Sequence, residues 1–145
     1  MGFLSHWDLH LLHPKVVHFP IALFLSAVGI EALSLIFKND SMHRSAWHLY
    51  VLAVMLTPFV VLTGLNEANH LKLHHPVLDL HQRFAFLTMY GSGISFVILK
   101  IIQRKKPVIF RFAFLAVVFI TAIFVSTAAY YGGEMVYEYG VGVEG

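Results

Sequence analysis

The stretch VVHFPIALFLSAVGIEALSLIF, residues 16–37, decides the fold of this chain. Its one acidic residue is Glu31, and it contains no Lys or Arg. A helix needs about 20 mostly apolar residues to cross the hydrocarbon core of a bilayer. Backbone amides find no water partners in lipid, so a spanning stretch of this kind pairs its amides internally as a helix. Residues 16–37 therefore predict a transmembrane helix.

Three more stretches have the same character, at residues 46–66, 81–102 and 109–131. Over all 145 residues, 58% are hydrophobic and 12% are charged, whereas a soluble domain carries about 25% charged residues. This balance excludes a soluble enzyme and a disordered chain. Short connections predict antiparallel neighbours. We expect a single all-α domain over residues 1–145, an integral membrane four-helix bundle with up-down-up-down topology.

Lys and Arg are unequally divided between the two ends of the predicted bundle. Three lie at one end and seven at the other, the seven being Lys38, Arg44, Lys100, Arg104, Lys105, Lys106 and Arg111. The positive-inside rule places the seven in the cytoplasm. Both termini then face outward, which in a bacterium is the periplasmic side of the inner membrane. The basic stretch at residues 100–111 is a topology signal, and no nucleic-acid motif is present.

Histidines gather at the predicted periplasmic end. Eight of the ten lie there: His6, His10, His13, His18, His70, His74, His75 and His81. Imidazole is the commonest metal ligand and an axial ligand of haem iron. Cysteine is absent, which excludes thiolate zinc sites, iron–sulfur clusters and covalently attached haem. His43 and His48, at the cytoplasmic end, are interpreted as loop and interface residues without a partner.

A short internal repeat selects two of these histidines. His13-Pro14 precedes His18 by five residues, and His75-Pro76 precedes His81 by six. The repeat predicts that His18 and His81 lie at matching depth on opposite sides of an axis along the membrane normal. Small residues follow both histidines at helical spacing. They serve close helix packing or leave room for a flat macrocycle.

We expect His18 and His81 to be the axial ligands of a b-type haem, with one or two haems per chain. His13 and His70 are reserve ligands or propionate partners, and Arg83 is a propionate contact because Arg pairs with carboxylates through two hydrogen bonds. Asp79, Glu67 or a backbone carbonyl would orient an imidazole. The predicted function is electron transfer near the periplasmic surface.

Two other functions stay open on the sequence. The cluster of His70, His74 and His75 could bind Zn, Cu or Fe in a metal-binding membrane protein. The short loops also suit a cofactor-free subunit that anchors a periplasmic enzyme. Glu31 should lie near the cytoplasmic boundary, solvated or paired with Arg. Residues 132–143, GGEMVYEYGVGV, are a belt anchor or a short lid over the outer site.

Three segments resemble a known family. HLLHPKVVHFPIAL, residues 10–23, resembles the pattern His-x-x-His-Pro-x-x-Val-His-Phe-Pro-Ile-Ala-Leu. The start of the third predicted helix, with His81, and residues 132–143 resemble two more of its segments. The family is that of bacterial four-helix membrane proteins known as domain of unknown function twenty-two thirty-one. Tyr139 stands where the family's tail has histidine, which favours His18 and His81 over a ligand in the tail.

The resemblance implies an inner-membrane protein found alongside c-type cytochromes and other respiratory components. It supports a role as a subunit or partner of an electron-transfer complex rather than as a stand-alone enzyme. Expected partners are the lipid bilayer, c-type cytochromes and a quinone. The acidic outer rim would attract a basic electron carrier by electrostatic steering.

Overall fold

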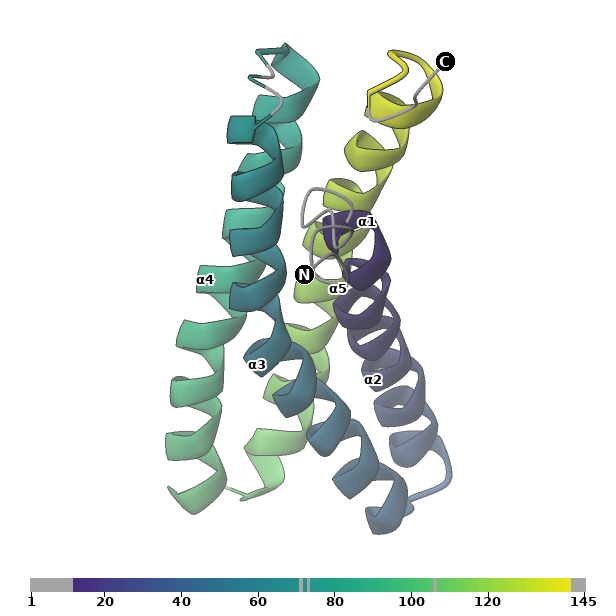
Figure 1. Cartoon of the computed structure of the whole chain (residues 1–145). Helices are drawn as coiled ribbons and strands as arrows, with labels where there is room; N and C mark the ends of the chain where they lie inside the picture. The colour runs from purple at the N-terminus through teal and green to yellow at the C-terminus, as the bar shows by residue number, and fades with distance from the viewer. Residues whose placement is uncertain (1–11, 71, 73, 106, 142–145) are drawn as a thin grey trace, which may run out of the picture.

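The computed structural model describes residues 12–70, 72, 74–105 and 107–141. They form helices α1 (Leu12–Val16), α2 (His18–Ile36), α3 (Asp40–His70), α4 (Pro76–Lys105) and α5 (Pro107–Tyr137). Because α1 leads directly into α2, the two make one membrane span, Leu12–Ile36, and the other three long helices each make another. The described part of the chain is all-helical, which confirms the four-helix membrane bundle (Figure 1).

The observed helices extend past most limits of the predicted spans because polar residues form their ends. Asn39 precedes α3, and its side-chain Oδ1 accepts hydrogen bonds from the amides of Ser41 and Met42 at 2.9 and 3.1 Å. This arrangement satisfies amides that have no partner within the helix. Proline stands at the first position of α4 and of α5, where its missing amide costs nothing. Hydropathy finds the lipid-facing centre of each helix, whereas such polar and proline signals set its ends.

The helices pack as a ring in which α2 contacts α3, α3 contacts α4, α4 contacts α5 and α5 contacts α2. Helices α2 and α4 therefore face each other diagonally. The α2–α3 and α4–α5 connections lie at one end, and the α3–α4 connection lies at the other end with the end of α5 (Figure 1). The chain thus consists of two hairpins, α1–α3 and α4–α5, packed side by side.

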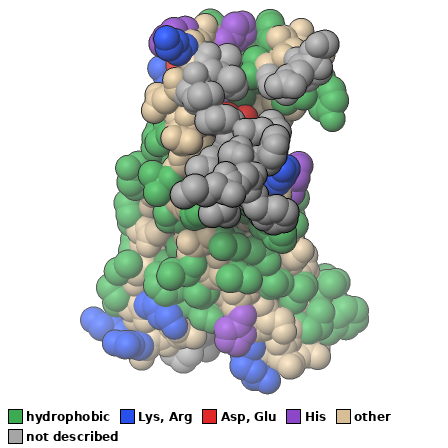
Figure 2. All heavy atoms as spheres, viewed as in Figure 1, with side chains coloured by type: hydrophobic (Ala, Val, Ile, Leu, Met, Phe, Trp, Pro, Cys, Tyr) green, Lys and Arg blue, Asp and Glu red, His purple; other side chains and the backbone are tan. Residues whose placement is uncertain are grey.

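The two halves of the bundle differ in packing. The half nearer the α2–α3 and α4–α5 connections holds an aromatic core in which Phe24, Tyr50 and Phe114 are fully buried. The hydroxyl of Tyr50 donates a hydrogen bond to the carbonyl of Ser92 on α4 at 2.9 Å. Below the undescribed residues, hydrophobic side chains make up much of the visible face, and several Lys and Arg side chains stand at its lower end (Figure 2). The other half of the bundle is hollow and contains the candidate site.

Candidate functional site

Two histidine rings face each other across the hollow half of the bundle. His13 comes from α1, which leads into α2, and His81 comes from α4. Helices α2 and α4 are diagonally opposed in the ring. Their ring centroids are 6.1 Å apart and their planes are at 87°. The structure therefore brings together His81 and a histidine that the sequence placed only in reserve.

His18, the expected partner of His81, lies elsewhere. It is exposed and contributes to the wall of the cavity described below. Five residues advance a helix by about 500°, so His13 and His18 cannot point in the same direction. The helix is also interrupted at Val17, between α1 and α2, just before Pro20, which has no amide to donate to the preceding turn. Sequence spacing alone did not show which of the two histidines faces inward.

Each facing imidazole is held by a backbone carbonyl. The Nδ1 of His13 lies 3.1 Å from the carbonyl oxygen of Val60 and 3.2 Å from the hydroxyl of Thr63. The Nδ1 of His81 lies 2.8 Å from the carbonyl oxygen of Ala128. A carbonyl only accepts, so Nδ1 carries the proton and Nε2 of a neutral ring keeps its lone pair. This is the tautomer of a histidine that binds a metal through Nε2.

A glycine makes room beside each ring. A Cβ at Gly64 would lie 2.8 Å from Cε1 of His13, and a Cβ at Gly132 would lie 3.3 Å from Cε1 of His81. Each glycine follows the accepting carbonyl, of Val60 or of Ala128, by one helical turn. The histidine, the carbonyl and the glycine form the same unit in both hairpins.

The two units are related by a fixed sequence offset. His81, Ala128 and Gly132 each follow their counterparts by 68 positions, and most residues of the cavity wall fall into pairs with the same offset. The internal repeat therefore exists, but its register differs from the predicted one. In the observed register the counterpart of His81 is His13, and the counterpart of His18 is Phe86. The cavity wall is therefore built from matching positions of the two hairpins.

The rings border a cavity of about 680 Å³ between the four spans. Small side chains make much of its wall, among them Gly64, Ala68, Ala85 and Ala128. Ala85, the first small residue that follows His81 at helical spacing, thus leaves room, one of the two roles expected for such residues. Glu67 and Gln82 also line the cavity. A volume in this range, with mostly apolar walls and a few polar groups, is typical of a site for a small molecule or cofactor.

The other predicted site residues lie apart from this pair. Arg83 and Asp79 are exposed and do not line the cavity, and a backbone carbonyl takes the orienting role considered for Asp79 or Glu67. His74 is exposed, and the ring of His75 lies 4.3 Å from that of Tyr139. The side chain of His70 and all of His6 and His10 lie outside the described residues. Within the described part of the chain, no three His, Asp or Glu side chains could share a metal ion.

Two expectations at the opposite end of the bundle were wrong. Glu31 is fully buried rather than solvated, and its partner is a histidine rather than an arginine. His43, expected to have no partner, is that histidine, with Nδ1 2.7 Å from a carboxylate oxygen. Their spacing of twelve residues spans the turn between α2 and α3, so the contact depends on how that turn closes, which hydropathy does not encode.

A sequence model described as "Predicted membrane protein (DUF2231)" matches residues 9–145, which include both facing histidines and both glycines. The chain belongs to this family. The match confirms the resemblance seen in the sequence motifs and the membrane location of the DUF2231 protein. Searches of curated proteins and of solved structures gave no match. The function of this DUF2231 protein must therefore be argued from its own site.

Proposed function

We propose that this DUF2231 protein binds one b-type haem through His13 and His81 and carries electrons at that end of the bundle. The observation that carries the proposal is the pair of imidazoles on diagonal helices, each with its Nδ1 committed to a backbone carbonyl. The proposal keeps His81 as a ligand and replaces His18 by His13.

The spacing of the two rings supports ligation of a single metal from opposite sides. Metal–nitrogen distances for histidine are about 2.0 Å, so two imidazoles on opposite sides of one metal have centroids roughly 6 Å apart. The observed separation is 6.1 Å. Two histidines are too few for zinc, which takes three or four protein ligands. They suffice for haem iron, whose macrocycle supplies four nitrogens.

The pseudo-symmetry of the cavity agrees with this ligand. A flat macrocycle presents two similar faces, and the cavity presents two similar walls, one from each hairpin. The carbonyls of Val60 and Ala128 would fix the ligand tautomer, and Gly64 and Gly132 admit the rings. His18 and Gln82 are polar groups of the wall that would meet propionates. When bound, haem iron accepts and releases one electron.

The distribution of Lys and Arg gives the proposed orientation of the bundle in the membrane. The end rich in Lys and Arg would face the cytoplasm, which puts the histidine pair near the periplasmic surface of a bacterial inner membrane. A c-type cytochrome would be the electron partner in water, and a quinone would be the partner in the bilayer. The protein would act as a subunit or partner of a respiratory complex.

The test is an oxidised and a reduced absorption spectrum of the full chain purified from cells supplied with haem, with haem, zinc and copper quantified. The proposal predicts about one haem per chain and a low-spin b-type spectrum in both redox states. Zinc or copper without haem would contradict it and point to the outer cluster of His70, His74 and His75. Absence of all three would contradict it and leave an anchor subunit.

A further inference from the structure

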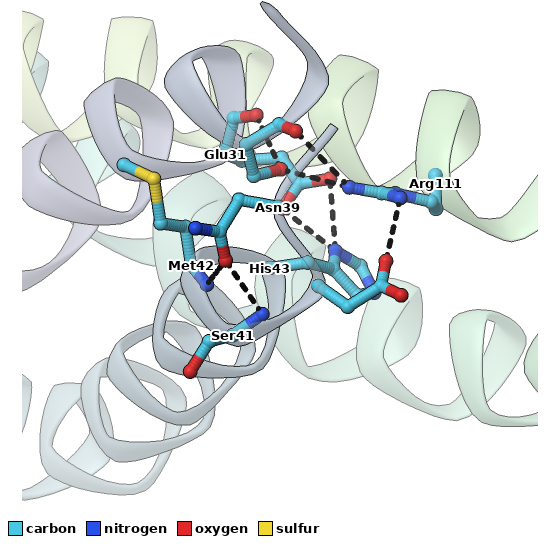
Figure 3. Close-up of polar contacts among 8 residues, drawn as sticks. Glu31, Asn39, Ser41, Met42, His43 and Arg111 are labelled. Carbon is cyan, nitrogen blue, oxygen red and sulfur yellow. Dashed lines mark hydrogen bonds and ion pairs between the residues drawn. The ribbon is translucent and has the colours of Figure 1, made fainter. Parts of the chain in front are cut away.

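A fully buried acid lies at the end of the bundle opposite the histidine pair. The side chain of Glu31 on α2 is 0% exposed, and Nδ1 of His43 on α3 lies 2.9 and 2.7 Å from its two oxygens (Figure 3). The ring of His43 packs edge-on against Phe110 and Phe114, with centroids 5.5 and 5.9 Å away. An acid inside a spanning helix is costly, and such residues usually serve a function.

Arg111, the permanently charged side chain beside this pair, donates its hydrogen bonds to other residues. Arg111 on α5 donates to the hydroxyl and the carbonyl of Ser34 at 3.2 and 3.4 Å, and to Oδ1 of Asp40 at 3.0 Å (Figure 3). Among the described side chains, His43 alone hydrogen-bonds to the Glu31 carboxylate. Arg is always charged, whereas His gains and loses a proton near neutrality. The buried acid is therefore paired with an imidazole rather than with a permanent cation.

The second hairpin carries no acid at the position that corresponds to Glu31. Sixty-eight positions after Glu31 stands Leu99, which is 1% exposed and part of the hydrophobic core. The counterpart of His43 is Arg111. The second hairpin thus fills the same place with a leucine. Replacing a buried ion pair by a hydrophobic residue of similar size is often neutral or stabilising, so stability alone does not explain Glu31.

The ionisable side chains near Glu31 differ in their exposure to solvent. Side-chain exposure is 0% at Glu31, 15% at His43, 24% at Arg111 and 76% at Asp40. Helix α4 contributes Lys100, whose ammonium lies 4.9 Å from the ring centroid of Trp47, one helical turn from His43. His43 thus lies between the buried carboxylate and the more exposed groups.

We propose that Glu31 and His43 form a proton-binding site. The pair holds one proton between the Glu31 carboxylate and Nδ1 of His43. On acidification it takes a second from a hydronium ion, which leaves as water, so that Glu31 becomes a neutral acid beside a cationic His43. The net charge of the pair rises by one, while Arg111 keeps its charge. The site does not depend on haem and lies at the other end of the bundle.

Infrared difference spectroscopy across a pH series tests this site in the full chain reconstituted in lipid nanodiscs. We expect a carbonyl band of a buried carboxylic acid that grows on acidification and shifts when the protein is labelled with ¹³C-glutamate. Glu31→Gln should remove the band. Asp40→Asn, which changes an exposed acid at the same end, should keep it.

Two further variants keep the test decisive. Glu31→Leu introduces the residue found at position 99 of the second hairpin and should fold with an unchanged helical circular dichroism spectrum, while also lacking the band. His43→Gln keeps a hydrogen-bond donor but cannot hold the proton, and should move the midpoint of the Glu31 band. No glutamate band in the wild-type protein at any pH at which it stays folded would overturn the proposal. So would a band that survives Glu31→Gln and Glu31→Leu, or a midpoint unchanged by His43→Gln.

Discussion

The imidazole of His13 lies so close to the backbone of Gly64 that a Cβ at this glycine would be 2.8 Å from the ring carbon Cε1. The corresponding distance between Gly132 and His81 is 3.3 Å. Both glycines stand inside long helices, where alanine would otherwise favour the helix by roughly 0.5–1 kcal/mol. Their presence is therefore explained by the rings that they admit.

Gly64→Ala should displace the His13 ring from its hydrogen bond with Val60, because the added methyl and the ring cannot both fit. Overpacking of this kind typically costs about 1–3 kcal/mol. We expect a lower apparent melting temperature and a lower haem content. Gly29→Ala is the matched control, since a Cβ there meets nothing within 4 Å, and it should be neutral or slightly stabilising. Equal melting temperatures for both variants would show that the contact between residue 64 and the His13 ring does not affect stability.

Gly132→Ala should have the same effect on His81 but a smaller one. A Cβ at Gly132 would lie 3.3 Å from Cε1 and Nδ1 of His81, a tight contact that requires the ring to move by a few tenths of an ångström. The two glycine variants, compared by melting temperature and haem content, should rank Gly64→Ala as the more damaging. The reverse order would contradict the geometry of the two rings.

The angle between the rings predicts a spectroscopic signature. Imidazole planes near a right angle, here 87°, interact about equally with the two iron orbitals that point above and below the macrocycle, so these orbitals stay nearly equal in energy. Oxidised low-spin haem should then give a strongly anisotropic electron paramagnetic resonance signal. The carbonyls of Val60 and Ala128 hold the ring planes in place on binding. A weakly anisotropic signal typical of parallel planes would count against this pair of ligands.

Tyr50→Phe should destabilise the aromatic half of the bundle without changing the histidine site. The hydroxyl of Tyr50 is buried and donates to the carbonyl of Ser92, and such a hydrogen bond contributes about 0.5–1.5 kcal/mol. We expect a lower melting temperature with an unchanged haem content. Loss of haem in this variant would mean that the two halves are coupled more tightly than their separate packing suggests.

Much of the fold followed from apolar run length alone, because lipid forces every long apolar stretch to become a helix. The ends of α3 and α4 were less predictable because Asn39 and Pro76 act through local hydrogen bonding rather than hydropathy. The histidine-rich end and the inward position of His81 also followed from the sequence. The histidine that faces His81 could not be predicted in this way. His13 and His18 belong to the same motif, and only the direction of each side chain distinguishes them.

The pair of Glu31 and His43 shows the same limit. Each residue was noticed on the sequence, but the two are twelve positions apart and a helix-to-helix turn lies between them. Two units with a shared offset of 68 positions could have been found by aligning the chain with itself, which pairs His13 with His81 and Gly64 with Gly132. The predicted register rested on the proline motif instead and paired the wrong histidine with His81.

The most direct test compares haem content and reduced spectra of His13→Ala, His81→Ala and His18→Ala with those of the wild-type chain. Each variant removes one imidazole, and His18 lies in the cavity wall but does not face His81. The account predicts that His13→Ala and His81→Ala each lose the low-spin b-type spectrum, while His18→Ala keeps it. Loss of that spectrum in His18→Ala, with His13→Ala unaffected, would contradict it.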